Sequence, residues 1–310
     1  MSGIAFVFPG QGSQAVGMGK DLFEKYDEVK DVYQNADEIM EMHLSKISFE
    51  GPSELLKETH ITQPALFVHS YAILKLLPEN LKATCAAGHS LGEYTANVYA
   101  NTFSFEEGLK LVKTRGQLMK NSGDVHRGTM AALIGLDEQQ IIEICEKAAG
   151  NQIVQPANFN CPGQIVISGD VDAIDRAVII AKEEPFRCRL AKKLEVSGAF
   201  HSELMRTSDD ELRIALGKVD FGDADIPIYT NVEGLPITDK NQIQNALYRQ
   251  LVSSVKWETS IRNMIKDGVR KFYEIGSGKV LTGLIKKIDN EAKVFNISNT
   301  DDLDCILKEA

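Results

Sequence analysis

Short apolar runs alternate along the chain with longer periodic segments, and together they predict strands followed by helices. Residues 4–8, IAFVF, form an apolar run that ends at Pro9-Gly10, which is typical of a buried strand. Residues 84–87 predict a second short strand. Helical patterns are expected at residues 21–42, 63–77, 91–100 and 105–120. This alternation indicates an α/β fold with a parallel sheet.

The middle of the chain has a different order of predicted elements. Strands are expected at residues 128–136, 153–158, 164–168 and 186–194, and helices at 137–149 and 170–183. This β-α-β-β-α-β order is typical of a ferredoxin-like unit. We therefore expect a small subdomain at residues 126–195, inserted into a larger subdomain formed by residues 1–125 and 196–310.

After this unit, strands and helices alternate again. Helices are expected at residues 201–216, 243–251, 257–267 and 280–288, and strands at 226–230 and 271–275. The outer parts of the chain therefore predict a doubly wound sheet, in which functional sites lie at the carboxyl ends of the strands.

A glycine-flanked serine follows the second predicted strand. Gly88-His89-Ser90-Leu91-Gly92 fits the pattern G-x-S-x-G of a nucleophile elbow, a tight turn between a strand and a helix. The N–H of Leu91, next after the serine, is then a natural donor to an oxyanion. The alternative is an ordinary glycine-flanked turn with an idle serine. The predicted strand before it and helix after it favour the elbow.

A serine nucleophile needs a base, and His201 is the best candidate among the six histidines. It follows a predicted strand, at the expected start of a helix, among small and apolar residues. A structural role at that helix end is an equal alternative. No aspartate or glutamate between Ser90 and His201 stands out at a strand end. We therefore expect a dyad whose imidazole is oriented by a backbone carbonyl.

Two further positions have candidate roles beside the serine. The loop FPGQGSQ at residues 8–14 lacks the GK[ST] of a phosphate loop, and Gln11 in it is the candidate for the second oxyanion N–H. Without that role, the loop is an ordinary turn. Arg115 lies on a mostly apolar predicted helix. It is a solvated surface residue by default, but if it points into the site, its planar fork would hold a carboxylate bidentately.

Composition and charge narrow the class of protein. The 310 residues are 43% hydrophobic and 25% charged, which is ordinary for a soluble globular protein. The net charge of -10 argues against nonspecific binding of nucleic acid. No apolar stretch is long enough to span a membrane, and the N-terminal segment lacks the basic region of a signal peptide. The five scattered cysteines show no metal-binding spacing, so we expect a cytoplasmic protein without metal or structural disulfides.

Several motifs in order resemble the malonyl-CoA:acyl carrier protein transacylase family, across nearly the whole chain. They are FPGQGSQ (8–14), TQPAL (62–66), GHSLGEY (88–94), the segment around Arg115, NFNCPGQ (158–164), AFHS (199–202) and GSGKVLTGL (276–284). The resemblance implies an α/β-hydrolase-like large subdomain and a ferredoxin-like small one, with the site between them. It also implies transfer of a malonyl group from malonyl-CoA to acyl carrier protein, in fatty acid or polyketide synthesis. No cofactor is implied, because malonyl-CoA is a substrate.

The resemblance also assigns roles to individual residues. It implies Ser90 as nucleophile, His201 as general base and acid, and the N–H groups of Gln11 and Leu91 as the oxyanion hole. It implies that Arg115 binds the malonyl carboxylate, that Phe200 narrows the pocket beside the α-carbon, and that Asn160 is a polar residue near the substrate. The segment around Gln250 matches the place where a backbone carbonyl orients the histidine.

Two other functions remain open from the sequence. A serine hydrolase or thioesterase that edits acyl carrier proteins would use the same dyad, although Arg115 would be of little use with neutral acyl chains. A noncatalytic adaptor would not need Ser90, His201 and Arg115 together. The family resemblance implies a monomer that binds its carrier protein transiently. The candidate docking residues are Arg187, Arg189, Lys192, Lys193, Lys279, Lys286 and Lys287, for which solvated surface charge is the simpler explanation.

Overall fold

The larger of two β-sheets carries the N-terminal strand at its centre. The computed structural model describes residues 3–309, and its six-stranded sheet has the order β10-β9-β1-β2-β7-β8. The strands are β1 (Gly3–Phe8), β2 (Cys85–Gly88), β7 (Ile228–Tyr229), β8 (Pro236–Ile237), β9 (Val269–Ile275) and β10 (Lys293–Ile297). All neighbours are parallel except the pair β7 and β8. The expected parallel sheet is confirmed, with a short antiparallel strand at one edge.

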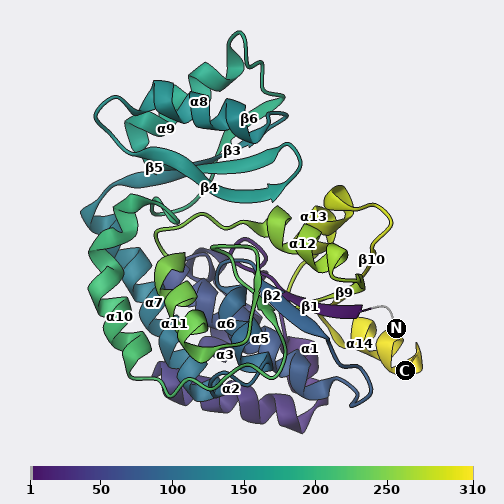
Figure 1. The fold of residues 1–310 in the computed structure, drawn as a ribbon. Helices are drawn as coiled ribbons and strands as arrows, with labels where there is room; N and C mark the ends of the chain where they lie inside the picture. The colour runs from purple at the N-terminus through teal and green to yellow at the C-terminus, as the bar shows by residue number, and fades with distance from the viewer. Residues whose placement is uncertain (1–2, 310) are drawn as a thin grey trace.

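Helices cover both faces of this sheet, as its buried central strand requires (Figure 1). Along β1, Phe6 and Phe8 belong to the core that is shared with α5, α6 and α7. The alternate residues Ala5 and Val7 belong to a second core with α12 and α13. The helices of this part are α1 (Lys20–Lys25), α2 (Asp27–Met40), α3 (Leu44–Glu50), α4 (Ser53–Leu56), α5 (Thr59–Leu76), α6 (Gly92–Tyr99), α7 (Phe105–Val125), α10 (Asp209–Gly217), α11 (Lys240–Gln250), α12 (Trp257–Lys266), α13 (Val280–Ile288) and α14 (Thr300–Glu309), with a 3-10 turn η1 (Glu203–Ser208).

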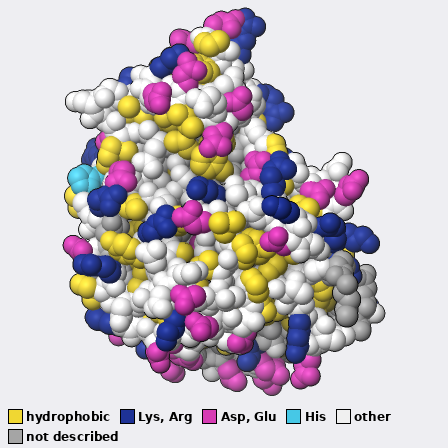
Figure 2. Space-filling model, viewed as in Figure 1, with side chains coloured by type: hydrophobic (Ala, Val, Ile, Leu, Met, Phe, Trp, Pro, Cys, Tyr) yellow, Lys and Arg dark blue, Asp and Glu magenta, His cyan; other side chains and the backbone are white. Residues whose placement is uncertain are grey.

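The second sheet forms a smaller lobe that projects from the larger body (Figures 1 and 2). Its four strands are antiparallel in the order β4-β5-β3-β6. The elements are β3 (Gly128–Ile134), α8 (Glu138–Ala149), β4 (Val154–Cys161), β5 (Gln164–Asp170), α9 (Val171–Lys182) and β6 (Leu190–Lys193). This is the expected ferredoxin-like order. The bounds 126–195 for a separate subdomain stay a prediction, and residues 1, 2 and 310 of the larger one lie outside the described residues.

Several predicted elements differ in extent from the observed ones. The expected helix at residues 21–42 is interrupted at Tyr26, whose extended backbone separates α1 from α2. The expected helix at residues 201–216 is wrong at its start, because His201 has a φ of 57° and precedes the 3-10 turn. Strand β10 and helix α14 were not expected. At Tyr26 and at His201 the backbone of a single residue ends the helical pattern, and periodicity alone does not reveal such a change.

Candidate active site

Ser90 lies on a strained turn between β2 and α6. Its φ of 51° is in the left-handed region, which is unfavourable for a residue with a side chain. The neighbouring glycines are required by close packing. A Cβ at Gly88 would overlap the backbone of Gly92, and a Cβ at Gly92 would overlap the carbonyl of Phe8. The two glycines therefore let the elbow press against β1, and the strain falls on Ser90.

Asn231 fixes the elbow from the neighbouring strand. Asn231 follows β7, which is parallel to β2, so Asn231 and the elbow lie at the same edge of the sheet. Its side-chain oxygen accepts from the N–H of Ser90 at 2.6 Å, and its amide nitrogen donates to the carbonyl of Gly88 at 2.6 Å. Its own N–H donates to the buried carboxylate of Glu93 at 3.1 Å. These bonds compensate for the unfavourable backbone of Ser90.

His201 faces the serine with its second ring nitrogen anchored. Its Nε2 lies 2.7 Å from Ser90 Oγ, and its Nδ1 lies 3.0 Å from the carbonyl oxygen of Gln250. Because a carbonyl only accepts, Nδ1 carries the proton and Nε2 is free to accept from the hydroxyl. Burial, and then the charge of Arg115, lower the pKa of His201 from 6.5 to about 3. The imidazole is therefore neutral, as a base for the serine must be.

Arg115 is a buried cation beside this pair, and only 1% of it is exposed. Its Nη1 donates to Gln63 Oε1 at 2.5 Å, while Nη2 donates to Gln250 Oε1 at 2.9 Å and to Ser90 Oγ at 3.0 Å. The guanidinium also lies 5.5 Å from the ring centre of Tyr94. No carboxylate in the described part of the chain forms an ion pair with it. A cation held this way by neutral amides is suited to an anion that enters the site.

Gln11 and Leu91 line the same pocket as Ser90 and His201. Within residues 3–309, neither backbone N–H has a hydrogen-bond partner. The side chain of Gln11 is held by Thr59, whose hydroxyl donates to Gln11 Oε1 at 2.8 Å. Two unpaired N–H groups beside a serine can receive the charge that develops on a carbonyl oxygen under attack.

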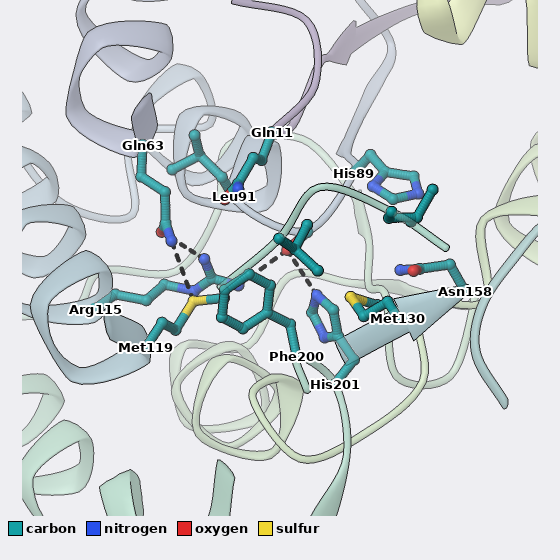
Figure 3. Close-up of a pocket in the computed structure, with 13 residues that line it drawn as sticks. Gln11, Gln63, His89, Leu91, Arg115, Met119, Met130, Asn158, Phe200 and His201 are labelled. Atoms are coloured by element: carbon teal, nitrogen blue, oxygen red, sulfur yellow. Dashed lines mark hydrogen bonds between the residues drawn. The ribbon is translucent and has the colours of Figure 1, made fainter. Parts of the chain in front are cut away.

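Phe200 closes the apolar side of the pocket, and Figure 3 shows it beside Arg115 and Met119. The other apolar side chains in the lining are Leu91, Met119, Met130, Leu194 and Val196. Asn160 does not line the pocket itself. Its Oδ1 is hydrogen-bonded at 2.9 Å to Nε2 of His89, which does line it. Asn158, two residues earlier on β4, is the asparagine in the lining.

Several residues of the site were not predicted from the sequence, among them Gln63, His89, Glu93 and Asn231. His89 lines the pocket, and its Nε2 is hydrogen-bonded to Asn160 Oδ1. Asn231 directly follows the predicted strand 226–230, so the rule that sites lie at carboxyl ends of strands could have found it. Glu93 follows Ser90 by three residues, and no sequence signal separates a buried glutamate there from an exposed one.

Two kinds of functional feature are not found among the described residues. They contain no group of three or more histidine, cysteine or acidic side chains arranged to hold a metal ion. No helix in the same part of the chain has the length and apolar character needed to cross a membrane.

The elbow and the dyad are those of an enzyme that transfers acyl groups through a serine, and the two-lobed fold agrees with the acyl transferases. A family model described as acyl transferase domain matches residues 5–297. The malonyl CoA-acyl carrier protein transacylase of Bacillus subtilis is 42% identical over 311 residues, covering 99% of this chain and 97% of that protein. This chain therefore belongs to the malonyl CoA-acyl carrier protein transacylase family of acyl transferases.

Solved structures agree with this family. An acyl carrier protein S-malonyltransferase from Vibrio cholerae matches with a TM-score of 0.94 and 41% identity, covering 98% of this chain and all of that one. A malonyl-transacylase solved in complex with a type II polyketide synthase acyl-carrier protein matches with a TM-score of 0.94 and 37% identity, covering 100% of both chains.

Proposed function

We propose that this protein transfers a malonyl group from malonyl-CoA to the thiol of acyl carrier protein through a malonyl-serine ester. The observation that carries the proposal is the buried Arg115 beside the Ser90–His201 pair. A thioester attacked by Ser90 places its acyl chain in the pocket, and only an acyl chain that ends in a carboxylate would use the buried guanidinium. The names of the relatives support the same donor and acceptor.

The first half of the reaction forms the ester. His201 Nε2 takes the proton of Ser90 Oγ as the oxygen attacks the thioester carbonyl. The N–H groups of Gln11 and Leu91 bind the resulting oxyanion. The bond between carbon and sulfur then breaks, and His201 returns its proton to the departing sulfur of CoA. Malonyl-serine and free CoA remain.

The second half repeats these steps in reverse order. The thiol of the carrier protein gives its proton to His201, its sulfur attacks the ester carbonyl, and the ester bond breaks. His201 then returns the proton to Ser90 Oγ. The carbonyl of Gln250 holds the imidazole throughout, so no acidic third member is needed.

Arg115 and Phe200 would select the acyl group. The carboxylate would take guanidinium N–H groups, including the one now shared with Ser90 Oγ. Phe200 would narrow the space at the α-carbon and disfavour a methyl branch. Asn160 would influence the substrate pocket indirectly, through its hydrogen bond to His89. The reaction as proposed uses no metal and no cofactor.

The carrier protein would dock transiently on basic side chains of the protein surface. Among the candidates, Arg187 is paired with Glu184 and Lys193 with Asp175, while Lys287 bonds to Gln164. Because Arg187 and Lys193 are neutralised by ion pairs, ordinary surface charge explains these two residues better than a docking role. The monomeric state and the cytoplasmic location stay predictions.

Intact mass spectrometry with malonyl-CoA, and separately with acetyl-CoA, tests the proposal in the absence of carrier protein. We expect a stable malonyl adduct that is absent in Ser90→Ala and that disappears when phosphopantetheinylated carrier protein is added. Release of CoA without an adduct would instead identify a hydrolase. If the wild-type protein gives neither adduct nor CoA release, the proposed transfer is wrong.

A further inference from the structure

Gln250 has a second set of contacts, separate from the backbone carbonyl that meets His201. It is the last residue of α11 and is fully buried. Its Nε2 donates to the carbonyl of Ser90 at 2.9 Å and to Glu93 Oε2 at 2.6 Å. Its Oε1 accepts from Arg115 Nη2 at 2.9 Å. Both ends of this amide therefore contact groups of the proposed reaction.

The chemistry of the neighbours permits only one orientation of the amide. If it were reversed, its NH₂ would face the guanidinium of Arg115, and its oxygen would face the Ser90 carbonyl and the Glu93 carboxylate. Both contacts would be repulsive, and they would be buried. Glu93 is 1% exposed and also accepts from the N–H of Asn231. This carboxylate thus holds the amide nitrogen on the side of the elbow.

The nitrogen end of the amide controls the direction of an oxyanion donor. The carbonyl of Ser90 and the N–H of Leu91 belong to one planar, trans peptide unit and point in opposite directions. A bond that fixes the Ser90 carbonyl therefore also fixes where the Leu91 N–H points. This effect applies to every acyl group that Ser90 accepts.

The oxygen end controls the position of the guanidinium. Arg115 reaches the pocket from α7, and Gln63 on α5 holds its other terminal nitrogen. With Gln250, these contacts place the plane of the fork next to Ser90 Oγ. This effect applies only to acyl groups that carry a free carboxylate.

We propose that the Gln250 side-chain amide, oriented by Glu93, is a positioning group for both the Leu91 N–H and the Arg115 guanidinium. The inference rests on the proposed malonyl transfer. It links the rate of acylation and the choice of acyl group to opposite ends of one buried amide.

Single-turnover loading of Ser90 from malonyl-CoA and from acetyl-CoA tests this pair of roles. Gln250→Met removes both ends of the amide but keeps the backbone carbonyl for His201. We expect the maximal rate with either donor to fall about tenfold, and the rate constant for dilute malonyl-CoA to fall about 100-fold. The malonyl-to-acetyl preference should therefore fall about tenfold, mainly through a higher half-saturating concentration of malonyl-CoA.

Two more variants separate these effects from loss of structure. Gln250→Glu loses the donor to Ser90 and places a carboxylate against Arg115, so loading from acetyl-CoA should slow as in Gln250→Met, while the malonyl-to-acetyl preference should fall because the guanidinium is already paired. Gln244→Met makes the same substitution on the same helix, where the glutamine side chain donates to the Leu216 carbonyl and touches neither Ser90 nor Arg115 in the hydrogen bonds of residues 3–309. It should load like the wild type.

The outcomes distinguish this inference from the function on which it rests. If Gln250→Met loads both donors at wild-type rates and with wild-type preference, the amide serves only for packing and the inference is overturned. If Gln250→Met does not fold, unchanged loading from acetyl-CoA by Gln250→Glu overturns the role of the nitrogen end, and an unchanged malonyl-to-acetyl preference overturns that of the oxygen end. Failure of the wild-type protein to load would instead be a failure of the proposed function.

Discussion

The Oγ atom of Ser90 lies 2.7 Å from the Nε2 atom of His201, although 111 residues separate them in the sequence. Both residues have a positive φ, 51° for Ser90 and 57° for His201. Each is held by a residue from a third segment, Asn231 for the serine and Gln250 for the histidine. The pair thus consists of two residues with strained backbones, and hydrogen bonds from outside fix the backbone of Ser90 and the ring of His201, as expected for a preorganised site.

Replacing Arg115 should change the choice of acyl group more than the reactivity of the serine. In Arg115→Ala we expect loading from malonyl-CoA to fall about 100-fold and loading from acetyl-CoA to fall much less, since only the malonyl group has a carboxylate to hold. Arg115→Lys keeps the charge without the planar fork, so its rate of loading from malonyl-CoA should lie between those of the wild type and Arg115→Ala. Stopped reactions analysed by intact mass give both rates. Equal losses with both donors would contradict a carboxylate-binding role.

Truncating Phe200 should relax the exclusion of branched acyl groups. Phe200→Ala opens space next to the pocket, and we expect the loading of methylmalonyl-CoA relative to malonyl-CoA to rise about tenfold. Phe221→Ala removes the same ring from a buried position beside Phe103 and serves as the control. Competition between the two donors in one reaction measures the ratio directly. An unchanged ratio would assign the selection to another part of the lining.

The glycines of the elbow should tolerate no side chain. Gly92→Ala places a methyl group against the Phe8 carbonyl, so we expect a loss of more than about 3 kcal/mol in the free energy of unfolding, or no folded protein. Gly283→Ala on helix α13 meets open space and should be neutral or stabilise by up to about 1 kcal/mol. Denaturant unfolding compares the two. A Gly92→Ala protein as stable as wild type would show that the packing at the elbow is not limiting.

His201 should make the folded protein sensitive to mild acid. Its pKa is about 3 in the fold and 6.5 in an unfolded chain, so between these values the unfolded chain binds a proton that the folded protein does not. Stability from this group is complete above pH 6.5 and is lost as the pH falls, by about 2 kcal/mol at pH 5. His201→Asn should lack this part of the acid dependence. The exposed His126 provides the control, since His126→Asn retains His201 and should follow the wild type.

Glu93 should change the stability of the folded protein with pH in the opposite direction. This effect does not enter the comparison of the wild type with His201→Asn. Burial raises the pKa of Glu93 from 4.5 to about 7, so its contribution is complete below pH 4.5 and is lost as the pH rises through 7. Because Glu93 is present in both the wild type and His201→Asn, its effect cancels in their difference. If that difference stays constant from pH 7 to pH 5, the histidine is not held neutral by burial.

The sequence alone determined the elements whose signals are local. The residues Gly88 to Gly92, together with the predicted strand before them and helix after them, predicted the elbow, since steric limits on a tight turn act between near neighbours. The β-α-β-β-α-β order predicted the small antiparallel sheet in the same way. Order of motifs along the chain then gave the family, including Ser90, His201 and Arg115 as the residues to examine.

Only the tertiary structure decided how these residues act together. The sequence favoured a surface position for Arg115. The residue is buried because α7 packs on α5 and on helix α6 of the elbow. Glu93, Gln250 and Asn231 come from three segments, and their hydrogen bonds span 138 to 160 residues of sequence. Hydrogen bonds and burial depend on which strand ends become neighbours in the sheet. That adjacency is set by the whole fold, so no local pattern could show it.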